Sequence, residues 1–265
     1  RILAFRQSGM MPQGVFMQWA DGIWQDVCGW FFPSVCAICG DGPLHRTCLC
    51  SSCRASLSMV EAPICPRCGE PLAGAVGEVG NCPYCGGGKV HYDFARSACL
   101  NKDHLRSLLH DFKYAGKIHF AGTLAGLIDD LWHTCDDRLA GEDWLLVPVP
   151  LHRRKLKKRG YNQAEELALI LSRLRKLPVL DALMRGKDNV SQASLGRKER
   201  LRHVQELYHM RPSVLRKELV KDRAVLLIDD IMTTGSTVDV CSRVLKKEGR
   251  ARCVGVLTVA RTVNT

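Results

Sequence analysis

The stretch V-L-L-I-D-D-I-M-T-T-G-S-T, residues 225–237, decides the fold of this chain. Its first four residues are apolar, which predicts a strand buried on both faces of a parallel sheet. Asp229 and Asp230 follow at the carboxyl end of that strand, where open α/β sheets bind their ligands. A small turn around Gly235 comes next, and apolar residues at helical spacing then predict a helix that ends near Gly249. The stretch therefore predicts one strand–turn–helix unit of an α/β sheet.

The order of these groups indicates a site for a sugar phosphate. N–H groups at the start of a helix attract anions, and the turn adds the hydroxyl groups of Thr233, Thr234, Ser236 and Thr237. A phosphate would repel Asp229 and Asp230, so these carboxylates are expected to accept hydrogen bonds from hydroxyl groups nearby. A phosphate beside a vicinal diol describes a ribose 5-phosphate. The Walker A pattern of nucleotide-binding loops is absent from the stretch.

The same stretch resembles type I phosphoribosyltransferases, whose pattern is four apolar residues, two acidic ones, two apolar ones and a T-T-G-x-T turn. Every position of that pattern is filled here. The resemblance implies that Asp229 and Asp230 hold the ribose 2′- and 3′-hydroxyls of phosphoribosyl pyrophosphate (PRPP), whose pyrophosphate is bridged by Mg²⁺. It also implies that the 5′-phosphate is held by Thr233, Thr234, Gly235, Ser236 and Thr237. The alternative is a buried strand end with a tight turn and no ligand.

A second predicted strand, at residues 144–150, runs into a strongly basic segment. A helix is predicted behind it, ending at Pro178. The basic segment is expected to be a loop and contains Arg153, Arg154, Lys155, Lys157, Lys158, Arg159 and Gly160. A strand, a basic loop and a helix predict an anion site at the same edge of the sheet. The resemblance places the pyrophosphate of PRPP here, while contact with nucleic-acid phosphates and a merely solvated charged surface stay open.

Eight of the 14 cysteines form four C-x-x-C pairs between residues 36 and 85. Two such pairs complete a tetrahedral site of four thiolates, so the chain is expected to hold two structural zinc ions. Sequential pairing gives one site from Cys36, Cys39, Cys50 and Cys53, and a second from Cys65, Cys68, Cys82 and Cys85. A cross-braced pairing stays open, as does the use of Cys48 in place of Cys50. A disulfide framework would not need this pairing, which favours a reducing, cytoplasmic setting.

Composition and charge describe an ordinary globular chain of 265 residues, 46% apolar and 25% charged. Its net charge of +11 favours polyanionic partners such as nucleic acid. No apolar run is long enough to span a bilayer, so we expect a soluble protein. We expect an N-terminal extension with an amphipathic helix at residues 1–32, a double zinc ribbon at 33–88 and a phosphoribosyltransferase-like domain at 89–265. Within the last, residues 185–202 are expected to form a mobile loop with Gln192, Arg197 and Arg200 as its residues of interest.

This layout resembles the ComF competence-protein family, which includes the GntX-type proteins. The agreeing segments are F-P-S-V-C-A-I-C-G at 32–40, F-K-Y-A-G at 112–116 and P-V-P-L-H-x-x-x-x-x-x-R-G-Y-N-Q-A at 148–164. The family implies a double zinc ribbon, a Rossmann-like phosphoribosyltransferase fold and a cytoplasmic role in natural transformation on incoming single-stranded DNA. Its partners would include a competence helicase or other DNA-processing proteins. One departure is H-V-Q-E-L-Y at 203–208, where the family has an Asn and a Gly-Ala-Phe-like group.

Two functions fit the sequence. One is a protein that binds PRPP or a nucleotide and acts in DNA uptake. The other is an active phosphoribosyltransferase of nucleotide metabolism or salvage with an unknown acceptor. Neither a general base nor an acceptor pocket can be identified from the residues, which favours the binding protein and leaves catalysis open.

Overall fold

The structure is a computed structural model that describes residues 35–42, 48–72, 82, 84–86, 90–134, 138–139, 142–186 and 207–263. The predicted amphipathic helix and the loop residues Gln192, Arg197 and Arg200 lie outside this part of the chain. The chain divides into two compact units between Leu57 and Ser58. The domain limits expected at residues 32 and 88 stay a prediction.

In the N-terminal unit, the described residues form a cysteine knuckle and a short helix. The N–H of Gly40 donates to the carbonyl of Cys36 at 2.9 Å, and Gly40 has a left-handed backbone with φ +79°. Helix α2 (Ser51–Ala55) begins at Cys50, whose sulfur accepts a hydrogen bond from the N–H of Cys53. The backbone therefore turns sharply at both C-x-x-C pairs of this unit.

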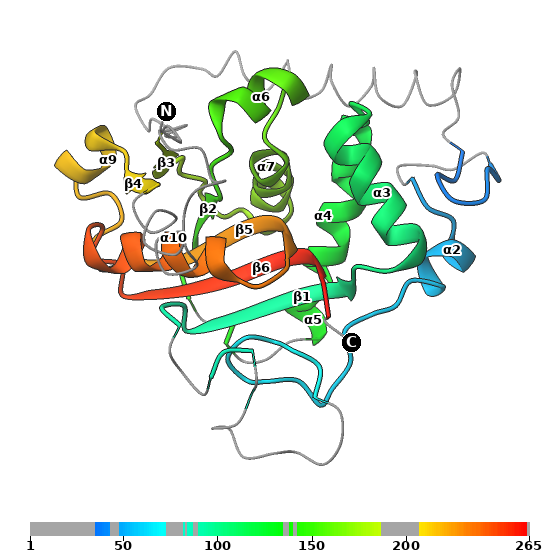
Figure 1. The fold of residues 1–265 in the computed structure, drawn as a ribbon, viewed down its shortest axis with the longest axis horizontal. Coiled ribbons are helices and arrows are strands. Elements are labelled where there is room, and N and C mark those ends of the chain that lie inside the picture. The colour runs from blue at the N-terminus through cyan, green and yellow to red at the C-terminus, as the bar shows by residue number, and fades with distance from the viewer. Residues whose placement is uncertain are drawn as a thin grey trace, which may run out of the picture. The chain divides into compact units, whose positions relative to one another are not determined.

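The C-terminal unit is built on a four-stranded parallel sheet in the order β1-β6-β5-β2 (Figure 1). The strands are β1 (Phe94–Leu100), β2 (Leu145–Pro148), β5 (Ala224–Met232) and β6 (Cys253–Arg261). The V-L-L-I run lies in β5, where all four residues are buried between β2 and β6. This confirms the predicted α/β fold with a parallel sheet. A separate antiparallel pair is formed by β3 (Leu183–Arg185) and β4 (Tyr208–Met210).

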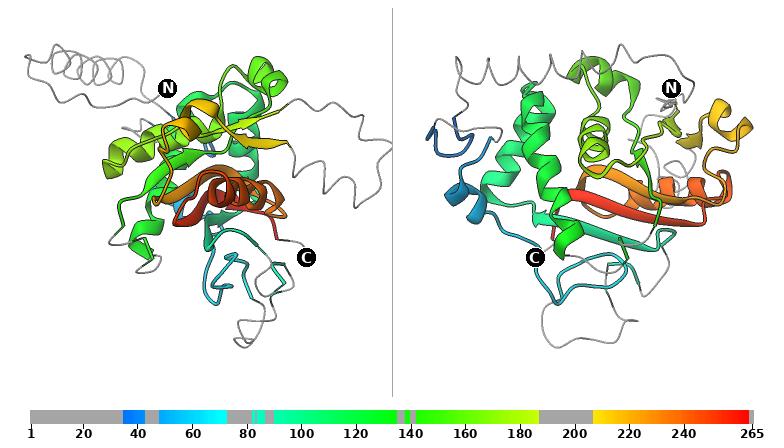
Figure 2. Two further views of the ribbon diagram at one scale, coloured as in Figure 1. Left: turned by 90° about the vertical axis from the view of Figure 1, so that its left-hand side faces the viewer. Right: turned by 180° about the vertical axis from the view of Figure 1, so that it is seen from behind.

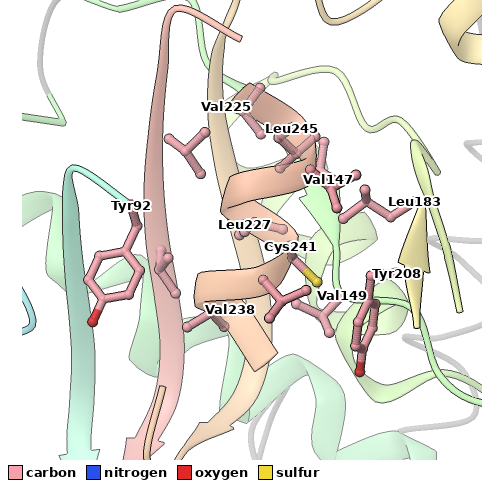
Figure 3. Packing of buried hydrophobic residues seen from close by; sticks show 14 of the residues in the cluster. Tyr92, Val147, Val149, Leu183, Tyr208, Val225, Leu227, Val238, Cys241 and Leu245 are labelled. Carbon is pink, nitrogen blue, oxygen red and sulfur yellow. The ribbon is translucent and has the colours of Figure 1, made fainter. Parts of the chain in front are cut away.

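Helices cover both faces of the sheet (Figures 1 and 2). The helices of this unit are α3 (Asp103–Tyr114), the 3-10 helix η1 (Ile118–Phe120), α4 (Ala121–Asp129), α5 (Leu131–Thr134), α6 (Arg153–Arg159), α7 (Gln163–Arg175), α9 (Pro212–Arg216) and α10 (Ser236–Lys247). Figure 3 shows Val238, Cys241 and Leu245 of α10 packed on Val225 and Leu227 of β5. Helices α4 and α7 pack on each other and on the opposite face. None of the described helices is long and apolar enough to cross a membrane.

The basic segment is helix α6, so the prediction of a loop there is wrong. The imidazole of His152 caps its start by accepting a hydrogen bond from the N–H of Arg154 at 3.2 Å. Gly160 ends it with a left-handed backbone of φ +84°. Charge alone does not determine backbone conformation, whereas Arg, Lys and Leu all have high helix propensity. The first bond within α6 runs from the N–H of Leu156 to the carbonyl of His152, so an anion contact beyond the first turn of α6 must use side chains.

Candidate functional site

The two carboxylates of the deciding stretch lie at the carboxyl end of β5. Asp230 is buried and pairs with Lys113 at the end of α3, with 2.9 Å between Oδ1 and Nζ. Asp229 is half-buried, and its Oδ1 accepts a hydrogen bond from the N–H of Asp230 at 2.9 Å. One carboxylate is thus held by a cation and the other by the backbone.

The environment of Asp229 favours its protonated form. Burial raises the pKa of this carboxyl to about 7, with repulsion from Asp230 as the next cause. The N–H of Asp230 and the charge of Lys113 oppose that rise. A carboxyl that titrates near neutral pH at a sheet's carboxyl edge is a common feature of functional sites.

The hydroxyl-rich turn joins β5 to α10 and is open to solvent. Gly235 caps α10 with a left-handed backbone of φ +73°, and Thr233, Thr234 and Ser236 are exposed. The hydroxyls of Thr234 and Ser236 lie 2.9 Å apart. The first bond within α10 runs from the N–H of Asp239 to the carbonyl of Gly235, so the N–H groups before Asp239 face the turn. The turn can bind an anion through these N–H groups and the hydroxyls.

Tyr208 supports this turn from β4. Its buried phenol forms a hydrogen bond with Thr237, and Figure 3 shows the ring beside the first half of α10. Burial raises the pKa of Tyr208 to about 12, so the phenol stays protonated. Tyr208 is the last residue of the segment 203–208, which departs from the ComF pattern. This residue therefore lies next to the predicted phosphate-binding turn of residues 233–237.

Lys113 was not among the predicted site residues, although it lies in the F-K-Y-A-G segment. The neighbours of Lys113 hold the F-K-Y-A-G segment, residues 112–116, against the R-G-Y-N-Q segment, residues 159–163. The hydroxyl of Tyr161 and the amide of Gln163 both donate to the carbonyl of Phe112. The Arg159 guanidinium lies 4.7 Å from the centre of the Tyr114 ring. Two segments far apart in sequence therefore position Lys113 beside Asp230.

We expect Lys113→Met to lower the free energy of unfolding by about 2 kcal/mol, because it leaves the buried Asp230 carboxylate without its charged partner. In an Asp230→Asn background the same change should cost less than about 0.5 kcal/mol. Urea unfolding of the four proteins measures the difference. Lys117→Met is the matched control, since Lys117 and Asp111 form an exposed pair, with side chains 44% and 36% exposed against 18% and 10% for Lys113 and Asp230. Equal losses of unfolding free energy for Lys113→Met and Lys117→Met would contradict a stabilising role for the buried Lys113–Asp230 pair.

The eight paired cysteines form two clusters in the sequential order. One consists of Cys36, Cys39, Cys50 and Cys53, and the other of Cys65, Cys68, Cys82 and Cys85. Within each cluster the sulfurs lie within 4.8 Å of one another, with contacts of 3.6 to 3.7 Å. Four sulfurs around a zinc ion are about 3.8 Å apart, so both clusters fit structural zinc. The cross-braced alternative is wrong, and Cys48 is in neither cluster.

Comparison with known proteins identifies the family. The family model of the double zinc ribbon domain matches residues 27–87, and that of the phosphoribosyl transferase domain matches residues 156–263. Competence protein F of Haemophilus influenzae is 30% identical over 228 residues, covering 83% of this chain and 93% of its own length. This chain belongs to the ComF family. The resemblance predicted from the sequence is confirmed.

Two other relatives carry related names. Competence protein ComFC of Bacillus subtilis is 28% identical, covering 81% of this ComF-family chain and 84% of its own. DNA utilization protein YhgH of Escherichia coli (strain K12) is 28% identical, covering 81% of this chain and 97% of its own length. A solved hypoxanthine phosphoribosyltransferase from Staphylococcus aureus is 11% identical, covering 54% of this chain and 74% of its own, with a TM-score of 0.33, too low to support an argument.

Proposed function

We propose that this ComF-family protein binds PRPP with Mg²⁺, or a nucleotide with a ribose 5-phosphate, at the carboxyl end of β5. The observation that carries the proposal is the order of groups there. Asp229 and Asp230 lie at the end of β5, two residues before an open turn of hydroxyls at the start of α10. The turn, from Thr233 to Thr237, would hold the 5′-phosphate. The two carboxylates would accept hydrogen bonds from the ribose hydroxyls, and Lys113, 2.9 Å from Asp230, would hold that side chain in place.

We further propose that the protein acts on single-stranded DNA in the cytoplasm during DNA uptake. Helix α6 supports this, since five of its cations are exposed: Arg153, Arg154, Lys155, Lys157 and Lys158. Beside them Tyr114 is 58% exposed, with the Arg159 guanidinium near its ring. Cations that follow a phosphate backbone, next to an aromatic ring on which a base can stack, suit single strands. The names of the relatives, which refer to competence and DNA utilization, support the same role.

The test of the ligand site is titration calorimetry of the zinc-loaded protein with PRPP and Mg²⁺, followed by an assay for pyrophosphate. Binding without pyrophosphate release is the result we expect of a binding protein. Release that depends on an added acceptor would instead establish an active phosphoribosyltransferase of nucleotide metabolism. Ribose 5-phosphate is the control ligand, since it carries the phosphate and both hydroxyls without the pyrophosphate. No heat with either compound would overturn the ligand proposal.

The DNA surface can be tested through salt dependence. Lys157→Ala with Lys158→Ala should reduce the slope of log affinity against log salt by about 1.4, because each phosphate contact on a single strand contributes about 0.7. Fluorescence anisotropy with a labelled oligonucleotide at several salt concentrations measures the slope. Arg216→Ala with Lys217→Ala removes the same charge from α9, away from α6, and should leave the slope unchanged. Equal slopes for the two double variants would exclude α6 from the DNA surface.

A further inference from the structure

The second cysteine cluster is built into the sheet of the C-terminal unit. The N–H of Ala95 in β1 donates to the carbonyl of Arg67 at 2.7 Å. Gly69, which follows Cys68, has φ +70°, and a Cβ there would lie 2.5 Å from the carbonyl oxygen of Ala95. Only a glycine allows the knuckle to approach β1 this closely. The cluster is therefore part of the fold that carries the Asp229–Asp230 site.

Arg261 connects this cluster to the ends of two strands. It is the last residue of β6, and its side chain is only 1% exposed. Its guanidinium donates to the carbonyl of Cys68 at 2.7 Å and to the sulfur of Met232 at 3.4 Å, and it pairs with the carboxylate of Glu70. One of its nitrogens lies 3.9 Å from the sulfur of Cys68. A buried set of four thiolates needs a compensating cation, and Arg261 supplies one.

Further contacts join Met232, a partner of Arg261, to the hydroxyl-rich turn of residues 233–237. Met232 ends β5 directly before the turn, and its methyl would lie 2.8 Å from a Cβ at Gly235. The hydroxyl of buried Tyr92, which lies between the cluster and β1 in sequence, would be 3.6 Å from that Cβ. The N–H of neighbouring His91 donates to the carboxylate of Asp239, in the first turn of α10. Met232, Tyr92 and His91 thus hold the turn and the start of α10 against the part of the chain that carries the second cluster.

We propose that metal occupancy of the second cluster and ligand binding at the turn of residues 233–237 are thermodynamically linked through Arg261, Met232 and Tyr92. The ligand half of this link rests on the function proposed above. Because linkage is reciprocal, metal at the second cluster favours ligand binding at the turn, and a bound ligand raises the affinity of that cluster for the metal by the same factor. The first cluster lies in the other compact unit and provides an internal control.

The first experiment measures zinc affinity in the full chain by equilibrium competition with a chromophoric chelator, with and without PRPP and Mg²⁺. A Cys36→Ser, Cys39→Ser variant lacks two ligands of the first cluster and so identifies the affinity of the second. We expect saturating PRPP to raise the affinity of the second cluster about tenfold and to leave that of the first cluster unchanged. If calorimetry shows that PRPP binds and the zinc affinity of the second cluster is still unaffected, the link is overturned while the ligand site stands.

The second experiment needs no ligand, so it tests the contacts that carry the link even if PRPP does not bind. Hydrogen exchange of peptides that span residues 232–239 is compared between the wild type and Arg261→Lys, both with zinc bound. Arg261→Lys keeps the charge but loses the planar fork of donors, so we expect exchange there to become about tenfold faster. Exchange in strand β2, at the other edge of the sheet from β1, should be unchanged. Arg252→Lys, in an exposed pair with Glu142 at the other end of β6, is its control. Unchanged exchange in the turn, or equal loss of protection in β2, would overturn the link.

Discussion

Changing both Asp229 and Asp230 to asparagine is expected to weaken binding of PRPP and Mg²⁺ by about 100-fold or more. A hydrogen bond to a charged group contributes about 1.5–3 kcal/mol, and each 1.4 kcal/mol is a factor of ten in affinity. Asparagine keeps the size of aspartate and an oxygen for the N–H of Asp230, so the turn should keep its shape. The loss of PRPP affinity would therefore measure the contribution of the two carboxylate charges, which are proposed to accept hydrogen bonds from the ribose hydroxyls.

Calorimetry of the double variant measures this loss, and metal analysis should still find two zinc ions per chain, as expected for two intact clusters. Asp111→Asn is the matched control. Asp111 lies on the same helix as Lys113 and pairs with Lys117 at the surface, so its loss should leave the affinity unchanged. Unaltered PRPP binding by the double variant would mean that the acidic pair does not contact the ligand.

The pKa of Asp229 gives this prediction a pH dependence. Since burial raises that pKa to about 7, the carboxyl is mostly protonated below pH 7 and ionised above it. A site that needs the ionised form should lose affinity by up to about tenfold for each pH unit below 7 and level off above 8. The charged groups around Asp229 are Asp230 and Lys113, and both are included in that pKa. The 5′-phosphate also titrates near pH 6, so the contribution of Asp229 is the difference between the wild type and Asp229→Asn.

The central strand–turn–helix unit could be predicted from sequence because its determinants are local. Four consecutive apolar residues followed closely by turn residues are typical of a strand covered on both faces, and all four are buried in β5. The apolar spacing of α10 likewise places Val238, Cys241 and Leu245 against the sheet. The C-x-x-C spacing fixed which cysteines bind metal, but two pairings satisfied it equally. Only the distances between the sulfurs exclude the cross-braced arrangement.

The residues that sequence reasoning missed owe their roles to contacts between distant segments. Lys113 meets Asp230 across 117 positions, from 113 to 230, and Arg261 meets Glu70 across 191. Periodicity reports whether a residue is buried or exposed, and a buried Arg or Lys leaves no periodic signal that distinguishes it from a surface cation. The F-K-Y-A-G segment could have pointed to Lys113, because a short segment shared with a family indicates a constraint on its residues. Nothing local marked Arg261 at the end of the last strand.

The two zinc clusters should differ sharply in what their loss does to the C-terminal unit. Cys65→Ser with Cys68→Ser removes two ligands from a cluster whose four cysteines are all buried, and leaves Arg261 and Glu70 in the interior beside it. Structural zinc contributes about 10–16 kcal/mol of binding free energy at neutral pH, comparable to the whole stability of a domain. A loss of about 10 kcal/mol corresponds to at least about 20 °C in Tm for a unit of this size.

Cys36→Ser with Cys39→Ser makes the same chemical change in the other compact unit, where Cys39 is exposed. Each double variant should hold one zinc ion per chain, but only the second-cluster variant should lose the thermal transition of the Ser58–Thr265 unit. Circular dichroism at increasing temperature, together with metal analysis of the same samples, measures both. Equal losses of Tm would mean that the clusters stabilise the chain alike. Retention of the full Tm by the second-cluster variant would show that the sheet, rather than the metal, holds the knuckle in place, because the close contact of Gly69 with Ala95 would then suffice.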